Sequence, residues 1–359
     1  MFGNEGATAL SYWLMDWLFH EKFVAIFSML FGVSLFLVGG EVFDKERGLN
    51  LGRRLAALVF FALIHGFGLW WGDILSTYAC AGIIMFAFRS LPPRALLGCG
   101  AAILLAAASQ ALPRQDSQPG ERPAAVTPDH TVSDAGHPPT ERIEAELAEA
   151  TASAKGAYSL NARTYVHQLS NLWRLLPQTI AFMMIGLGLF KLRFFSATWS
   201  QHAYLAIAGV GLLALTVLSQ VTWMHDVRGL HLRWGTFIED LLSPCAALGY
   251  MASLILALRY GLGRWLSPFA YAGRMAFTNY LTQSLIMTSI FYGGRGALMG
   301  HVDRPALWAI VVAIWILQLA WSRWWLSRFE MGPLEWLWRW ATYGYRTRFV
   351  KPVLQPGRT

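Results

Sequence analysis

Two ionisable residues, His65 and Asp73, lie eight positions apart in the apolar stretch FALIHGFGLWWGD. Ionisable groups are costly inside a membrane, so each one found there is by default a functional candidate. A histidine can exchange a proton near neutral pH, and a carboxylate about two helical turns away could share its face. The pair predicts acid–base chemistry, and no second His, Cys or Glu at ligand spacing suggests a metal. Two structural alternatives stay open: His65 joins two helices, and Asp73 caps the helix that follows it.

A second polar group follows in the stretch PFAYAGRMAFTNYLTQSL. Arg274 lies six residues into an apolar segment that begins at Pro268, and Asn279 and Gln283 follow it at i+5 and i+9. Such hydrogen-bonding groups either join helices or line a cavity, and their density here favours a cavity. The alternative for Arg274 is a side chain that reaches out to the membrane surface.

Other chemical signals are weak. Cys80, Cys99 and Cys245 lie singly in apolar runs, which is typical of small buried hydrophobic residues. The sequence has no GxxxxGK[ST], GxSxG or HExxH motif, so the common soluble-enzyme sites are excluded. The pairs at 186/188 and 209/211 are short glycine patches that predict close helix packing.

The elements that must position these residues are membrane helices. The 359 residues are 55% hydrophobic and 14% charged, against about 25% charged in soluble proteins, which excludes a soluble enzyme and a disordered chain. A bilayer core about 30 Å thick needs about 20 apolar residues per helix. We therefore predict an all-α polytopic bundle of about nine spans at 23–40, 54–72, 74–91, 95–112, 175–190, 202–221, 240–258, 268–292 and 306–326.

The basic residues predict the orientation. The net charge is +8, and most of the 29 Lys and Arg fall in alternate connections and in the C-terminal tail. Cytoplasmic loops collect Lys and Arg, so the C-terminus is expected in the cytoplasm and the N-terminus outside. We interpret the positive net charge as a consequence of this membrane topology and not as a nucleic-acid-binding surface. The protein is expected in the inner membrane of a bacterium as a multi-pass chain.

The domain organisation has three parts. Residues 1–112 form about four N-terminal spans, and 172–359 form about five spans with an interfacial cytoplasmic tail. Between them, 113–171 reads as a largely disordered loop outside the membrane, because prolines fill its first half. Within this segment, 141–157 has helix-forming residues but few large apolar ones, which predicts a solvated helix outside the membrane.

Three stretches together resemble one bacterial family, the YeiB-like integral-membrane proteins of domain-of-unknown-function family 418. The stretches are KFVAIFSMLFG (22–32), RRLAALVFFALIHGFGLWWGDILSTYA (53–79), and GRMAFTNYLTQSLI (273–286) followed by FEMGPLEWLWRW (329–340). The resemblance spans nearly the whole chain except 113–171. Family members usually begin with an additional helix that carries an Asp…Arg-Gly motif, and this sequence starts beyond it.

The resemblance implies a site as well as a fold. The family is grouped with membrane acyltransferases, in which an embedded histidine assists acyl transfer from cytoplasmic acyl-CoA to an acceptor outside. Arg53, Arg54, His65 and Asp73 fall on the family's Arg…His…Asp-Ile-Leu pattern. A second pattern, Gly-Arg-Met…Thr-Asn-Tyr, is matched by Arg274, Asn279 and Tyr280.

The leading hypothesis is an acyltransferase-like membrane protein. His65 would be the general base and Asp73 would orient it or the acceptor, while Arg53 and Arg54 would attract the phosphates of acyl-CoA. We expect a lipid bilayer as partner, acyl-CoA as co-substrate, and no resident cofactor or metal. One alternative is a transporter of a small solute, with the same polar residues along its path. The other is a non-catalytic membrane assembly protein.

Overall fold

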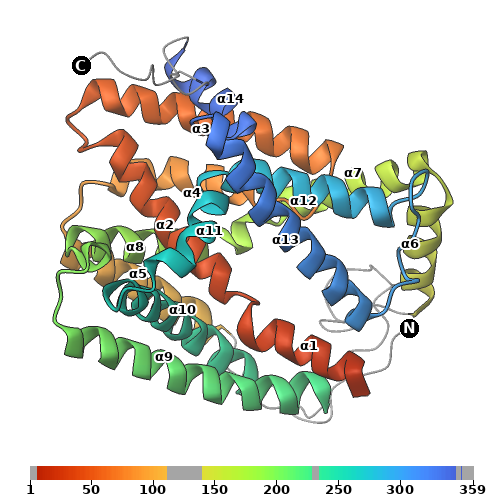
Figure 1. Ribbon diagram of the computed structural model, residues 1–359, viewed down its shortest axis with the longest axis horizontal. Coiled ribbons are helices and arrows are strands. Elements are labelled where there is room, and N and C mark those ends of the chain that lie inside the picture. The colour runs from red at the N-terminus through yellow and green to blue at the C-terminus, as the bar shows by residue number, and fades with distance from the viewer. Residues whose placement is uncertain (1–5, 111–139, 229–233, 345–348, 350–359) are drawn as a thin grey trace, which may run out of the picture.

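The computed structural model describes residues 6–110, 140–228, 234–344 and 349, and it contains no strand in these residues. Fourteen α-helices carry the fold (Figure 1). They are α1 (Gly6–Leu18), α2 (Lys22–Gly39), α3 (Lys45–Gly68), α4 (Leu75–Phe88), α5 (Pro93–Ser109), α6 (Thr140–Ala152), α7 (Ala154–Ser170), α8 (Leu176–Lys191), α9 (Gln201–Thr222), α10 (Gly235–Arg259), α11 (Gly263–Arg274), α12 (Ala276–Phe291), α13 (Arg304–Arg328) and α14 (Pro333–Tyr343).

The all-helical prediction is confirmed, and every predicted span overlaps a helix. Five segments are long and apolar enough to cross a membrane: Gly6–Gly39, which holds α1 and α2, and the helices α3, α9, α10 and α13. Three shorter apolar helices, α4, α5 and α8, lie among them. The number of crossings and the orientation of the termini stay predictions.

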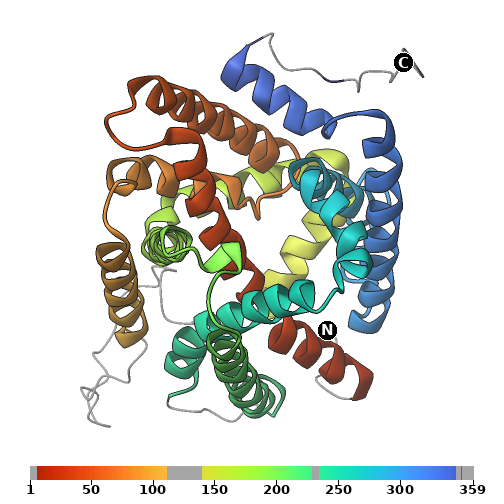
Figure 2. The same ribbon diagram turned by 60° about the vertical axis from the view of Figure 1, so that its left-hand side comes forward.

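Helix α13 shows how much apolar surface the bundle leaves uncovered. It lies at the edge of the molecule beside α12 (Figure 2), and only 17% of its most apolar window is buried. Its outward residues include Ile316 and Leu317, each more than half exposed. An apolar surface of this kind is suited to lipid and not to water.

The predicted span 268–292 is wrong as a single helix. α11 ends at Arg274 and α12 begins at Ala276, with Met275 between them. The break is stabilised by side chains that satisfy its free backbone groups: the Thr278 N–H donates to Glu335, and Asn279 Nδ2 donates to the Ala272 carbonyl. Arg274 therefore lies exposed at a helix end, not six residues into a span.

Small residues let the helices approach closely, as the glycine patches predict. A Cβ on Gly186 of α8 would overlap the backbone of α2, and one on Gly211 of α9 would overlap Gly249 of α10. A Cβ added at Gly209 would meet no atom within 4 Å, so only Gly211 of this pair marks a close approach of two helices.

The second half of the predicted loop is helical, as expected over 141–157, but its helices extend to Ser170 and pack against the bundle. Residues 111–139 lie outside the described part of the chain, but 140–170 form helices α6 and α7. α7 packs against α3, and its Tyr165 is fully buried. This helix reaches the site described next.

Candidate functional site

His65 and Asp73 come from the place where α3 gives way to α4. α3 ends at Gly68, and residues 69–74 cross to α4 without helical structure. His65 lies in the last turn of α3, and the backbone N–H groups of Leu69 and Trp70 both donate to its carbonyl. The chain therefore turns back directly after His65 and brings Asp73 to its side chain.

The two side chains form a buried hydrogen-bonded pair. His65 Nδ1 lies 2.8 Å from Asp73 Oδ1, and both side chains have no exposed surface. A carboxylate can only accept, so the network assigns the ring proton to Nδ1. This assignment leaves the lone pair of Nε2 available as an acceptor.

Asp73 is also the cap of α4, so both interpretations of this residue hold in one geometry. Its Oδ1 accepts from Leu75 N–H at 3.2 Å, and its Oδ2 accepts from the N–H and the hydroxyl of Ser76 at 2.8 and 2.6 Å. With His65, four donors converge on one carboxyl group. Charge-assisted hydrogen bonds of this kind hold the carboxylate in one orientation.

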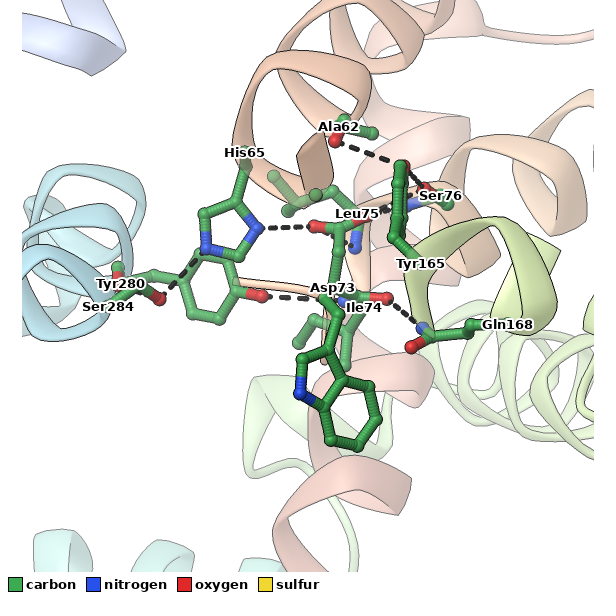
Figure 3. Close-up of polar contacts among 12 residues, drawn as sticks. Ala62, His65, Asp73, Ile74, Leu75, Ser76, Tyr165, Gln168, Tyr280 and Ser284 are labelled. Carbon is green, nitrogen blue, oxygen red and sulfur yellow. Dashed lines mark hydrogen bonds and ion pairs between the residues drawn. The ribbon is translucent and has the colours of Figure 1, made fainter. Parts of the chain in front are cut away.

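The other ring nitrogen of His65 contacts a serine from a distant part of the chain. Nε2 lies 2.8 Å from Ser284 Oγ, which α12 supplies (Figure 3). Tyr280, one turn earlier on α12, places its ring at a centroid distance of 4.9 Å from the imidazole, and its hydroxyl accepts from Ile74 N–H at 3.3 Å. The result is a continuous series of contacts from Ser284 through His65 to Asp73.

Helix α7 holds this arrangement from the opposite side (Figure 3). Gln168 donates to the Asp73 carbonyl at 2.7 Å, and Asn161 donates to the carbonyls of Gly66 and Phe67, which α3 leaves free at its end. The Tyr165 hydroxyl lies 2.7 Å from Ser76 Oγ and 3.1 Å from the Ala62 carbonyl. Burial raises the pKa of Tyr165, so it keeps its proton and acts as a donor.

An apolar cavity of about 550 Å³ lies beside Ser284. Its polar groups include Tyr280, Gln283 and Ser284, and most of the remaining wall is apolar, as at Met287 and Phe291. We call it the apolar cavity. Its volume is in the range of small-molecule sites, which combine apolar walls with a few polar groups.

A second cavity, of about 690 Å³, lies between the side of α3 at Arg54 and the segment 330–343, which holds α14. Arg54, Arg274 and Arg339 line it together with Glu330 and Glu335. We call it the arginine pocket. It is far more polar than the apolar cavity, and its three guanidinium groups are suited to an anion such as a phosphate.

Three aromatic rings in contact lead from the arginine pocket to α3. The guanidinium of Arg54 lies 4.3 Å above the ring of Trp338, Trp338 packs on Phe277 at 5.4 Å, and Phe277 packs on Phe61 at 5.1 Å. Phe61 is one turn before His65 on α3. We call Trp338, Phe277 and Phe61 the aromatic row. Its side chains occupy the direct path from the arginine pocket to His65.

The structure brings together some of the residues that the sequence nominates. His65, Asp73 and Tyr280 meet, and Gln283 lies in the same cavity wall as Ser284, where it donates to Gln318. Arg54 and Arg274 share the arginine pocket, about 16 Å of helix away from His65 by the rise of α3.

Two nominated residues lie apart from both cavities. Asn279 is buried between α11, α12 and α13, where its amide donates to Ala272 O and Ser322 Oγ. Arg53 is exposed and lines neither cavity. Among the described residues, no three His, Cys, Asp or Glu side chains gather closely enough to hold a metal ion.

Sequence reasoning missed Ser284 and the α7 residues. Asn161, Tyr165 and Gln168 are spaced i, i+4 and i+7, which places them on one helical face. This polar face on a weakly apolar helix was the available signal. Ser284 gave none of its own, because serine is common at helix interfaces in membranes.

Comparison with known proteins gives the family. Residues 189–345 match the family described as "Protein of unknown function (DUF418)". The chain is 31% identical to uncharacterized protein YeiB of Escherichia coli (strain K12), over 91% of this chain and 83% of that protein. It is 30% identical to uncharacterized protein YxaH of Bacillus subtilis (strain 168), over 92% of this chain and 81% of that protein.

A third relative is an uncharacterized 39.9 kDa protein from Bacillus acidopullulyticus, 24% identical over 90% of this chain and 80% of that protein. No solved structure matches. Identity of about 30% over most of both chains is too extensive for a shared motif alone. The chain belongs to the YeiB-like DUF418 family.

Proposed function

We propose that the protein is a membrane-embedded acyltransferase that moves an acyl group from a phosphate-bearing thioester, acyl-CoA, to a hydroxyl acceptor. One observation carries the proposal: a buried histidine has one ring nitrogen on a carboxylate and the other on a hydroxyl beside an apolar cavity. Taking a proton from a hydroxyl as it attacks a carbonyl is the reaction for which this arrangement is suited.

His65 is the general base in this proposal. Asp73 fixes the tautomer and stabilises the imidazolium that forms when His65 takes the proton, as an orienting carboxylate does in hydrolases. The four donors on Asp73 prevent it from turning away. Tyr280 covers one face of the imidazole and limits its motion.

The donor enters through the arginine pocket in this proposal. Arg54, Arg274 and Arg339 hold its phosphates, and the thioester extends along α3 toward His65. The acyl chain lies in the apolar cavity. Because Phe61 and Phe277 occupy the direct path from the arginine pocket to His65, donor binding must displace at least one ring of the aromatic row. Arg53 and Asn279 have no role in this mechanism.

The proposal includes the predicted topology. The chain crosses the bacterial inner membrane about nine times, with its N-terminus outside and its C-terminus in the cytoplasm. The arginine pocket then faces the cytoplasm, where acyl-CoA is found, and the apolar cavity faces the outer half of the membrane. The acceptor is therefore a hydroxyl compound outside the cytoplasm.

The test is an acylation assay with the purified protein in lipid nanodiscs. Labelled palmitoyl-CoA is the donor, lipid extracts and glycans are offered as acceptors, and release of free CoA is followed. We expect His65→Ala to lower CoA release by at least about 100-fold, because general base catalysis contributes about 10²–10⁴-fold. The matched control is His20→Ala, which removes a second histidine that also contacts an aspartate.

Equal CoA release by the wild type and His65→Ala would remove His65 from the mechanism. Solute counterflow in proteoliposomes without acyl transfer would replace the proposal with a transporter. A protein that does neither, yet is needed for the assembly of a membrane complex, would favour the non-catalytic alternative.

A further inference from the structure

Ser284 differs from Thr282, Thr288 and Ser289 of its own helix. In a helix, serine and threonine usually donate to the carbonyl four residues earlier. Thr288 does so at 2.8 Å and Ser289 at 2.6 Å, whereas the corresponding contact of Ser284 is 3.5 Å. Its shorter contact, 2.8 Å, is to His65 Nε2. The single proton of Ser284 therefore points at the lone pair of the imidazole.

This geometry is that of an activated nucleophile. Hydroxyl, imidazole and carboxylate stand in line with two contacts of 2.8 Å each. The His65 and Asp73 side chains are fully buried, and Ser284 lies at the edge of the apolar cavity with 6% of its surface exposed. Of Ser284, His65 and Asp73, Ser284 alone lines the cavity, so it is the member of this arrangement that a ligand in the cavity meets.

A second apolar space adjoins the cavity on the side of the bundle surface. Met287, Arg304 and Leu307 also line this second apolar space of about 480 Å³, which reaches Met15 and Trp315. Both of these side chains are about two-fifths exposed, on the apolar outer face of α1 and α13. A hydrocarbon chain that starts at Ser284 can therefore run through both spaces to the surface.

We infer that Ser284 accepts the acyl group as a covalent ester, and that the acyl group is a long hydrocarbon chain held in these two apolar spaces. The inference rests on the proposed acyltransferase function and adds to it a two-step route through the protein. The transfer is then a double displacement and not a direct passage from donor to acceptor.

Both steps balance. In the first, Ser284 Oγ loses its proton to His65 Nε2 and bonds to the thioester carbonyl carbon; the C–S bond breaks, and the thiolate takes the proton from His65. In the second, the acceptor hydroxyl gives its proton to His65 and bonds to the same carbon. The bond from that carbon to Ser284 Oγ breaks, and the serine regains the proton.

The experiment uses two probes on the full-length protein in nanodiscs, without acceptor. One is alkyne-tagged palmitoyl-CoA, and the other is an alkyl fluorophosphonate, which needs only an activated serine. Adducts are located by peptide mass spectrometry. Neutral hydroxylamine removes thioesters that form on Cys80, Cys99 or Cys245 and leaves an oxygen ester on serine intact.

We expect both probes to modify Ser284, and labelling to fall at least about 100-fold in Ser284→Ala and in His65→Ala. Ser284→Cys is a second test that the acyl group attaches at residue 284. Its palmitoyl adduct would be a thioester, so hydroxylamine would remove it. Ser289→Ala, one turn along the same helix, is the control and keeps wild-type labelling.

Two results separate this inference from the proposed function. Acyl transfer that persists in Ser284→Ala but needs His65 would overturn the covalent step and leave the acyltransferase intact. Fluorophosphonate labelling of Ser284 without any transfer from palmitoyl-CoA would establish the nucleophile and overturn the proposed donor. Absence of both labels from Ser284 in a folded protein would end the inference.

Discussion

Two histidine–aspartate pairs in the described part of the protein have the same contact distance. His20 Nδ1 and Asp16 Oδ1 are 2.8 Å apart, as are His65 Nδ1 and Asp73 Oδ1. The first pair lies within one turn near the end of α1, and the side chain of His20 is 61% exposed. The second joins two sides of a chain reversal and has no exposed surface.

The difference shows that a short contact does not make a site. The Thr222 hydroxyl of α9 donates a hydrogen bond to the other carboxylate oxygen of Asp16, so this pair helps to hold α1 against the bundle. Around His65, by contrast, the turn after α3 supplies Asp73 and α12 supplies Ser284, while Gln168 of α7 holds Asp73 and a cavity begins at Ser284. What distinguishes the second pair is therefore its surroundings, and each prediction below changes one part of them.

The largest effect is expected from Asp73→Asn. An amide in place of the carboxylate turns a donor toward either His65 or Ser76, which disfavours the tautomer that leaves Nε2 free. We expect acyl transfer and fluorophosphonate labelling of Ser284 to fall at least about 100-fold. Asp16→Asn is the matched change in the other pair and should keep the rate within about twofold. Equal losses in both variants would contradict the distinction.

Gly66→Ala should have the next largest effect. A Cβ at Gly66 would overlap the ring of Tyr165, so α7 must move away from α3. Overpacking of this kind costs about 1–3 kcal/mol. Thermal unfolding in detergent should show a lower midpoint than for Gly68→Ala, whose added methyl group meets no atom within 4 Å. If both variants unfold at the same temperature, α7 does not hold the site as described.

Tyr165→Phe is expected to have the smallest effect. It removes one hydroxyl from the contacts with Ser76 and Ala62 but leaves the bonds between Ser76 and Asp73 in place. A neutral hydrogen bond is worth about 1 kcal/mol, and we expect acyl transfer to change less than about threefold. Tyr158→Phe, on the exposed side of α7, is the control. A loss as large as that of Asp73→Asn would instead place Tyr165 in the chemistry.

The sequence predicted the helices well where the physics is local. Apolar length alone located α2, α9, α10 and α13, although it missed α1 and began α3 nine residues late, and the cost of burying an ionisable group pointed to His65 and Asp73. It could not show that they touch, because α3 stops at Gly68 and their contact depends on the turn that follows.

The rest depends on contacts between distant parts of the chain. The break at Met275 is fixed by Glu335, more than fifty residues later, and this break sets where Ser284 lies along α3. α7 has too few large apolar residues to predict burial, yet Tyr165 is fully buried because Gly66 leaves room for its ring. Neither feature could be read from the pattern of a single segment.

The position of the aromatic row has an electrical consequence. If the protein crosses the membrane as proposed, the arginine pocket opens on one side and the apolar cavity on the other, and Trp338, Phe277 and Phe61 pack together between the pocket and α3. A membrane potential of 100 mV is worth about 2.3 kcal/mol for each elementary charge. The part of that voltage that falls between the two cavities would then act across these three packed rings.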